Sequence, residues 1–140
     1  MAEDAVALGR RVARHLIIED VKPTPSRLAS ELNVEIIRKE SPPPAQCGLR
    51  SEYCADPPQI ILYLEPINEL RASIQANQHL DRMCCDLEEV HIAHELFHYL
   101  EFTADFGPLP RAEAEAAAHA FTQELMGLDF HPSELGEVIA

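Results

Sequence analysis

Two histidines and a glutamate stand at a spacing that can do chemistry. His94, Glu95 and His98 form the pattern H-E-x-x-H. Residues four apart lie one above the other on a helix, so both imidazoles can bind one metal ion. Glu95 points about 100° away from them, close enough to hold a water molecule beside that ion. Two neutral nitrogen ligands and one carboxylate that takes a proton from water are typical of zinc hydrolases.

A pair of hydrogen-bonded core histidines is the alternative at this position. The two residues between the histidines, Leu96 and Phe97, are apolar and predict a buried helix. Buried histidines need either polar partners or a metal ion. His91 and Glu101 fall on the same helix face, and either could be a polar partner of the ligands. Neither is expected to bind the ion, since a third donor from one helix closes a tetrahedron badly.

A catalytic zinc ion takes three protein ligands and keeps one open position. The compact pattern H-E-x-x-H-x-x-G-x-x-H does not continue here, because Glu101 and Ala104 occupy the places of its glycine and last histidine. The third ligand must therefore come from elsewhere. Three carboxylates that follow the motif are candidates: Asp105, Glu113 and Glu115.

Helical periodicity alone does not choose between Glu113 and Glu115, which flank the apolar face of the last helix on opposite sides. Glu115, however, has His119 one turn later on its own flank. A glutamate with such a neighbour is expected of a metal ligand and the side chain that orients it. The alternative is that both glutamates are charges favoured by the dipole at a helix N-terminus. An oxyanion partner is also required, and His119 or Tyr53 could serve.

These strings resemble the ImmA/IrrE family of small zinc metallopeptidases. That family shows A-H-E-h-x-H and then a helix of the form E-x-x-A-N-x-F-A-x-x-L-L-M-P. This chain has A-H-E-L-F-H at 93–98 and E-A-A-A-H-A-F-T-Q-E-L-M at 115–126. The likeness covers most of 25–128, through "LASELNVEII" and "PPQIILYL". Three positions depart from it: Phe97 replaces a frequent glycine, His119 the usual asparagine, and Leu128 the closing proline.

The resemblance implies a zincin-like domain in which His94, His98 and Glu115 hold Zn²⁺ and Glu95 is the general base. It also implies an endopeptidase that cleaves a specific protein, with a DNA-binding regulator among the candidates. The alternative is a regulatory or interaction module that keeps the metal for folding and cuts nothing. The presence of Glu95 favours catalysis, because a purely structural zinc ion needs no base.

The elements that must position these residues can be predicted from apolar periodicity and from breaking residues. The order of helices, small sheet and helices indicates a single α+β domain over 1–140, whose C-terminal helix carries the third ligand. Three successive prolines at 42–44 predict an irregular loop. The segment 48–54 could be an edge strand to which a substrate peptide adds, or an ordinary exposed strand. Helices are expected over 4–18, over 66–78, over 86–101, over 111–126, and from a cap at Thr24 or Ser26 to Leu32; strands are expected over 34–40, 49–54 and 59–64.

The balance of charge is strongly acidic, at −13 from 24 acidic and 11 basic residues. Such a surface repels phosphate backbones and anionic lipids, so neither nucleic acid nor a membrane is expected as a direct partner. A basic peptide or protein would be attracted, although solubility alone also explains an acidic surface. The first twenty residues do not form a signal peptide, and no segment approaches a membrane span, which predicts a cytoplasmic protein.

The four cysteines are expected to be reduced thiols that serve as small buried residues. Their spacing fits no common zinc-binding pattern, because one pair is too far apart and the other is adjacent. They are Cys47, Cys54, Cys84 and Cys85.

Overall fold

The chain folds as an α+β domain, as predicted. The computed structural model describes residues 4–17, 21–83, 85–104 and 106–138. The helices and strands are α1 (Ala5–Leu16), α2 (Pro25–Glu31), β1 (Glu35–Lys39), β2 (Ser51–Ala55), β3 (Pro58–Tyr63), α3 (Leu64–Gln75), α4 (Leu87–Thr103) and α5 (Arg111–Met126). Short 3₁₀ helices are η1 (Pro44–Gln46), η2 (Gln78–Met83) and η3 (Pro132–Glu137).

The three strands form one mixed sheet in the order β1-β3-β2. The central strand, β3, is parallel to β1 and antiparallel to β2, and in the second pair Ser51 lies opposite Leu62. Ile60 and Leu62 of β3 are fully buried, as their apolar run predicted. Strand β2 therefore lies at an edge of the sheet, which confirms that part of the prediction for 48–54.

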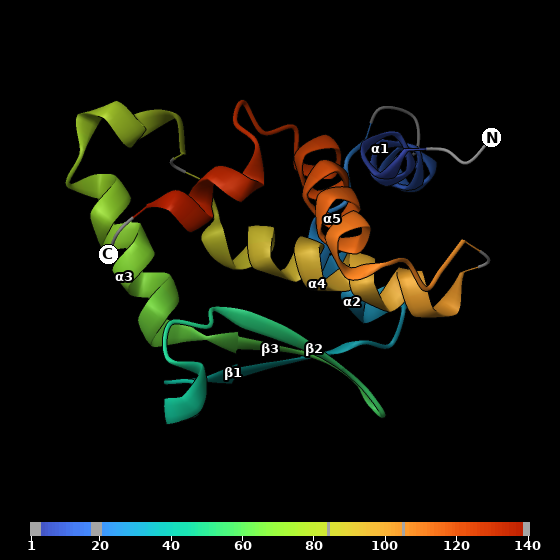
Figure 1. Ribbon diagram of the computed structural model, residues 1–140, viewed down its shortest axis with the longest axis horizontal. Coiled ribbons are helices and arrows are strands. Elements are labelled where there is room, and N and C mark those ends of the chain that lie inside the picture. The colour runs from blue at the N-terminus through green and yellow to red at the C-terminus, as the bar shows by residue number, and fades with distance from the viewer. Residues whose placement is uncertain (1–3, 18–20, 84, 105, 139–140) are drawn as a thin grey trace.

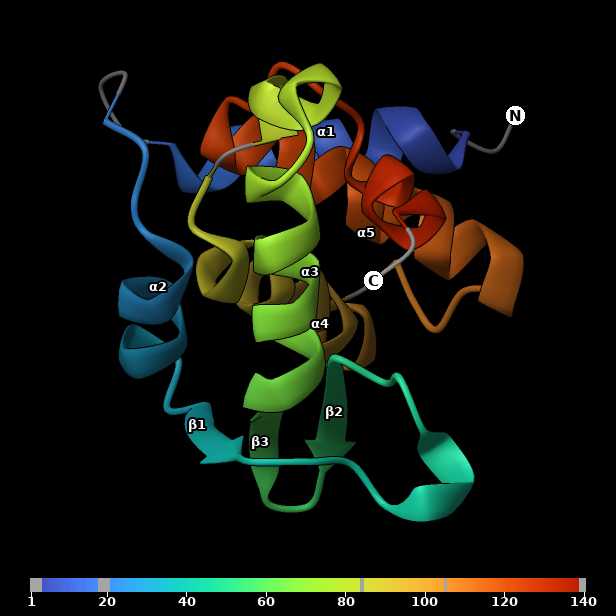
Figure 2. The same ribbon diagram turned by 90° about the vertical axis from the view of Figure 1, so that its left-hand side faces the viewer.

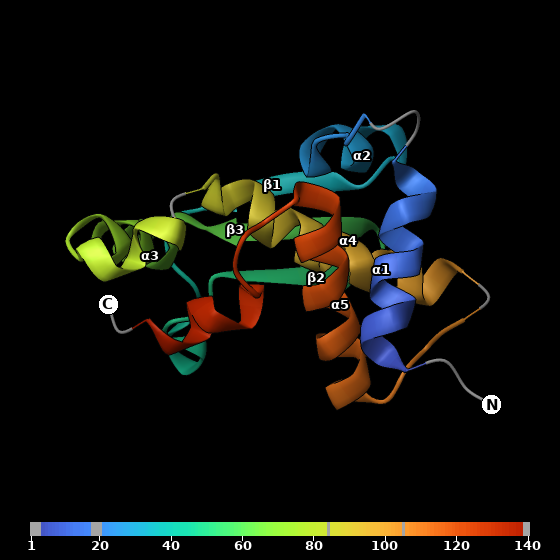
Figure 3. The same cartoon turned by 90° about the horizontal axis from the view of Figure 1, so that it is seen from above.

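The elements stack in layers, with the sheet at the bottom of Figure 1, α4 across it, and α5 and α1 above. α4 packs on β2 and β3, and α5 packs on both α4 and α1. Figure 3 shows α1 and α5 side by side. Figure 2 shows α3 rising directly from the end of β3. The core fills the space between the layers; among its fully buried residues are Ile60, Leu62, Leu96, Phe97 and Phe121.

Prolines account for two differences from the predicted elements. The proline loop contains the 3₁₀ turn η1, so the expectation that it is wholly irregular is wrong. α3 begins at Leu64, two residues before Pro66, so β3 ends one residue earlier than predicted. Proline is compatible with the first turn of a helix, where its missing N–H would have no intrahelical partner. The predicted end of the first helix at residue 18 lies outside the described residues.

Two contacts fix the helices that carry the candidate site. At the start of α4, the carboxylate of Glu89 accepts hydrogen bonds from the backbone N–H and the hydroxyl of Ser26, at 2.8 and 2.5 Å. Where α1 meets α5, a Cβ atom added to Gly9 would lie 2.1 Å from the carbonyl oxygen of Ala117. The absence of a side chain at Gly9 therefore lets the two helix backbones approach closely. α5 ends at Gly127, whose φ of 64° is left-handed.

The described cysteines are free thiols, and Cys84 lies outside the described residues. Cys54 and Cys85 are partly buried, whereas Cys47 is exposed. The expectation of burial is wrong for Cys47, because it follows the polar proline loop at the surface. Within the described ranges, no helix is both long and apolar enough to cross a membrane.

Candidate metal centre

The structure brings His94, His98 and Glu115 together at the crossing of α4 and α5. One oxygen of Glu115 lies 2.9 Å from Nε2 of His94, and the other lies 3.2 Å from Nε2 of His98. The two histidine Nε2 atoms are 3.3 Å apart. All three residues are partly buried, and their ligand atoms lie within 4.8 Å of one another. This group could hold a metal ion.

The other two candidates for the third ligand do not enter this group. Glu113 is exposed on α5, while Asp105 lies outside the described residues. Periodicity left Glu113 and Glu115 open, and the crossing of the helices brings Glu115, not Glu113, beside the two histidines. α5 buries Ala114, Ala117 and Ala118, and this turns the Glu115 flank toward α4.

Glu101 holds the ring of His98 from the side away from Glu115. One carboxylate oxygen of Glu101 lies 3.1 Å from His98 Nδ1, and the other accepts the backbone N–H of Leu109 at 2.8 Å. Glu101 is only 4% exposed. When His98 is neutral, this contact favours the proton on Nδ1, so that Nε2 can bind an ion. The sequence placed Glu101 on this face as a possible partner, and the structure identifies what it touches.

Charges inside the group are strongly coupled. Burial opposes the charged form of His98, but hydrogen bonds to Glu115 and Glu101 outweigh it and raise its pKa to about 9. The hydrogen bonds from His94 and then His98 hold the pKa of Glu115 well below its ordinary value. The group therefore combines a carboxylate with an imidazolium that an arriving cation would have to deprotonate.

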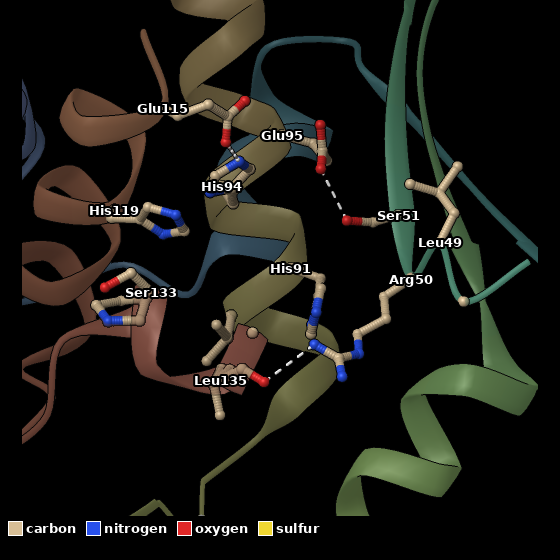
Figure 4. A pocket seen from close by; sticks show the side chains of 14 residues that line it. Leu49, Arg50, Ser51, His91, His94, Glu95, Glu115, His119, Ser133 and Leu135 are labelled. Carbon is tan, nitrogen blue, oxygen red and sulfur yellow. Dashed lines mark hydrogen bonds and ion pairs between the residues drawn. The ribbon is translucent and has the colours of Figure 1, made fainter. Parts of the chain in front are cut away.

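Glu95 lies next to the group without joining it. Its side chain is 7% exposed, and its carboxylate accepts a hydrogen bond of 2.7 Å from the hydroxyl of Ser51 in β2. Figure 4 shows this contact, with Glu95 facing the strand and His94 facing Glu115. Glu95 is thus held in place but not committed to a cation, as expected of a base.

His119 and Tyr53, the two expected oxyanion partners, lie in different surroundings. The ring of His119 lines the pocket beside the group, 4.7 Å from the ring of His94. Its Nδ1 is buried and has no partner among the described residues. Burial and then the charge of His94 lower the pKa of His119 to about 4, so it is neutral at pH 7. No hydrogen bond joins it to Glu115 in the part that the structure describes.

Tyr53 does not line the pocket; its ring packs against Tyr99 and Phe102, with ring centres 6.2 Å away in both cases. A role for Tyr53 as oxyanion partner stays a prediction. It would require a substrate that contacts both the pocket and Tyr53.

A pocket of about 290 Å³ opens beside the group, between α4, the start of β2 and η3. Sequence reasoning missed two side chains here, Ser51 and Arg50, and also missed the wall that η3 supplies. Ser51 is 44 residues from Glu95 in the chain, so no local pattern could pair them. For Arg50, the only signal was a basic residue within a predicted strand of a very acidic chain.

Comparisons with protein-family models, with curated proteins and with solved structures find no match to this chain. The resemblance to the ImmA/IrrE family therefore stays a hypothesis, and the functional argument depends on the site itself.

Proposed function

We propose that this protein is a zinc-dependent endopeptidase with a zincin-like fold, in which His94, His98 and Glu115 hold the ion and Glu95 is the general base. The substrate is a peptide segment of a protein, and a DNA-binding regulator in the cytoplasm is one candidate. The observation that carries the proposal is the convergence of two imidazoles and one carboxylate with an uncommitted, buried carboxylate in the next position of the same helix.

The spacing of the donor atoms supports zinc. Zinc–nitrogen bonds of about 2.0–2.1 Å in a tetrahedron place neighbouring ligand atoms about 3.3 Å apart. Here the two histidine Nε2 atoms are 3.3 Å apart, and they lie 2.9 and 3.2 Å from the two different oxygens of Glu115. Three protein ligands would leave a zinc ion one open position, and His94, Glu95 and Glu115 line the pocket from which a substrate could reach it. A bound zinc ion would polarise a substrate carbonyl and lower the pKa of a water molecule.

The residues of the chain supply the remaining steps. Glu95 accepts a proton from water as that water attacks the carbonyl carbon, and it then delivers the proton to the leaving amine. The Ser51 hydroxyl keeps the Glu95 carboxylate turned toward the pocket. Neutral His119 can donate a hydrogen bond to the oxygen that gains negative charge. Edge strand β2 offers backbone groups to an extended substrate.

The alternative function is a metal-binding regulatory module without hydrolytic activity. It requires the same three ligands but gives no role to a buried carboxylate beside them. Burying the Glu95 carboxylate is destabilising, and a structural zinc site has no need of a buried carboxylate beside its ligands. This cost favours the peptidase.

The decisive experiment compares wild type with Glu95→Gln. By elemental analysis we expect one zinc ion per chain in both proteins. Wild type should cleave a peptide library, and the variant should cleave it about 10²- to 10⁴-fold more slowly. Glu113→Gln is the matched control, because this exposed glutamate lies outside the metal-binding group. Equal cleavage by Glu95→Gln would refute the mechanism, and loss of zinc from it would make Glu95 a ligand. Zinc-loaded wild type that cleaves nothing would support the regulatory module.

A further inference from the structure

Arg50 is a cation in the wall of the pocket that contains the proposed base. It directly precedes β2 and lines the pocket together with His91, His94 and Glu95 of α4. Figure 4 shows its side chain extending across the pocket toward the Leu135 carbonyl of η3, which accepts a hydrogen bond of 3.2 Å from Nη1. Among the described residues, this is the one hydrogen bond of the Arg50 side chain, which carries five N–H donors.

Among the residues that the structure describes, no carboxylate balances the charge of Arg50. Arg14, Arg27, Arg38 and Arg82 each pair with a glutamate, at 2.7 to 3.3 Å. In the described part of the chain no ion pair reaches Arg50, even though acidic residues outnumber basic ones by 24 to 11. Burial lowers the pKa of Arg50, which means that its guanidinium has lost part of its water. A partly desolvated cation without a counter-charge is costly, and an arriving anion would recover that cost.

The neighbours of Arg50 do not supply that anion. Burial is the main cause that lowers the pKa of His91 to about 4, and the charges of His94 and Arg50 add to it, so His91 is neutral at pH 7. Glu95, the buried carboxylate that lines the same pocket, accepts a hydrogen bond from Ser51 and forms no ion pair with Arg50. The free donors of Arg50 therefore face a pocket that a ligand can enter.

The position of Arg50 fixes where a ligand carboxylate would lie relative to the reacting centre. Arg50 lies beside His91, and His91 precedes Glu95 by four residues, about 6 Å along the helix. An extended peptide advances about 3.3 Å per residue. A carboxylate bound to Arg50 would thus lie within about two residues of the peptide bond that faces Glu95.

We propose that Arg50 is a specificity-determining residue that binds a substrate carboxylate within about two residues of the cleaved bond. The planar guanidinium fork matches a carboxylate in two parallel hydrogen bonds. The carboxylate comes either from an Asp or Glu side chain or from the C-terminus of the substrate. This inference rests on the proposed function, because the ligand is a substrate only if the protein is a peptidase. The carboxylate site itself can be tested without cleavage.

A purely structural role for Arg50 would be to tether η3 through the Leu135 carbonyl. The structure offers a matched control, because η3 has a second tether: Arg82 donates to Glu134 at 2.7 Å. Arg82→Met removes that tether and leaves the pocket charge, whereas Arg50→Met removes both a tether and the pocket charge. A role in carboxylate binding predicts that the two variants differ.

The first measurement is cleavage of amidated peptides in which each position carries either Glu or Gln, together with a set that ends in a free carboxylate. We expect wild type to favour Glu over Gln at one position near the cut, or the free acid over the amide, by about tenfold or more. The ratio should fall to about one in Arg50→Met and persist in Arg82→Met. Equal rates for all carboxylate and amide pairs in wild type would overturn the inference, as would an equal loss of preference in both variants.

The second measurement is an NMR titration of short peptides into metal-free wild type and both metal-free variants. The metal is removed so that no ion attracts the peptide carboxylate. The probes are acetyl-Ala-Glu-amide against acetyl-Ala-Gln-amide, and acetyl-Ala-Ala with a free against an amidated end. Tighter binding of either carboxylate peptide than of its amide, lost in Arg50→Met, supports the carboxylate site. If wild type also cleaves nothing, only the proposed peptidase activity is refuted. Cleavage without a carboxylate preference in either measurement leaves the peptidase and overturns the role of Arg50.

Discussion

At the scale of single residues, Glu101 sets how well His98 can bind an ion. Its buried carboxylate holds His98 Nδ1 at 3.1 Å and so makes Nε2 more basic. Glu101→Gln keeps the shape but removes the negative charge, and we expect zinc affinity to fall about 10- to 100-fold. Competition with a chromogenic chelator measures this change.

The control for Glu101→Gln is again Glu113→Gln, which removes an exposed carboxylate from the neighbouring helix. Circular dichroism should show the same fold in both variants. Zinc affinity that is unchanged in Glu101→Gln would mean that the carboxylate only supports the backbone N–H of Leu109.

The histidines of the site give metal-free protein a stability maximum near neutral pH. His98, with a pKa raised from 6.5 to about 9, contributes stability that is fully present below pH 6.5 and is lost as the pH rises toward 9. His91 and His119, with pKa values lowered to about 4, contribute stability that is present above pH 6.5 and is lost as the pH falls toward 4. We therefore expect the free energy of unfolding to be highest near pH 6.5.

Urea unfolding of metal-free protein between pH 5 and 9 measures this profile. The alkaline decrease should disappear in His98→Gln, because that variant has no imidazole to lose a proton. It should also disappear in zinc-loaded protein, where binding has already removed the proton from His98. A metal-free profile that is flat between pH 6.5 and 9 would contradict the charge assignment of His98.

Single residues differ in how far the sequence could predict their roles. His94 and His98 follow from a local spacing, because residues four apart share a helix face whatever the fold. Glu115 required the crossing of two helices to separate it from Glu113. Ser51 and Arg50 could not be predicted at all, since their contacts depend on how the sheet edge docks against α4.

At the scale of elements, the packing of α1 on α5 positions Glu115. The carbonyl oxygen of Ala117 occupies the space where a Cβ of Gly9 would be, at 2.1 Å. Gly9→Ala must therefore push α1 away from α5, and we expect a loss of about 1–3 kcal/mol in the free energy of unfolding. Urea unfolding of zinc-loaded protein measures the loss.

Gly136→Ala is the matched control for Gly9→Ala, because a Cβ at Gly136 meets no atom within 4 Å. Gly136→Ala should change stability by less than about 0.5 kcal/mol. If both variants unfold alike, the close approach of α1 and α5 does not limit stability.

The elements themselves were predictable where the pattern is strong. The cap at Asp86, the apolar centre of α4 and Gly127 after α5 define those helices locally. The sequence did not indicate η2 or η3, because short 3₁₀ turns have weak periodicity and depend on their packing. The unpredicted η3 is also the element that completes the pocket wall.

At the scale of the whole molecule, a net charge of −13 should draw basic partners toward the protein. We expect peptides with lysine at least four residues from the cut to be cleaved several-fold faster than glutamine counterparts at low salt. The advantage should disappear as the screening length falls from about 10 Å at 0.1 M salt to about 3 Å at 1 M. Rates of cleavage that do not depend on distant lysines would mean that the acidic surface serves solubility alone.

The site is assembled from parts that differ in their distance along the chain, and this has a consequence for folding. The three proposed metal ligands lie within residues 94–115, whereas Ser51 reaches Glu95 across 44 residues. Contacts between neighbouring parts of a chain form sooner than contacts between distant parts, because less chain entropy is lost in closing a short loop. A refolding chain can thus capture its ion on the α4–α5 hairpin before β2 arrives to orient the base. The ability to bind metal would then appear earlier in folding than the ability to cleave, so a partly folded chain would hold zinc without attacking its neighbours.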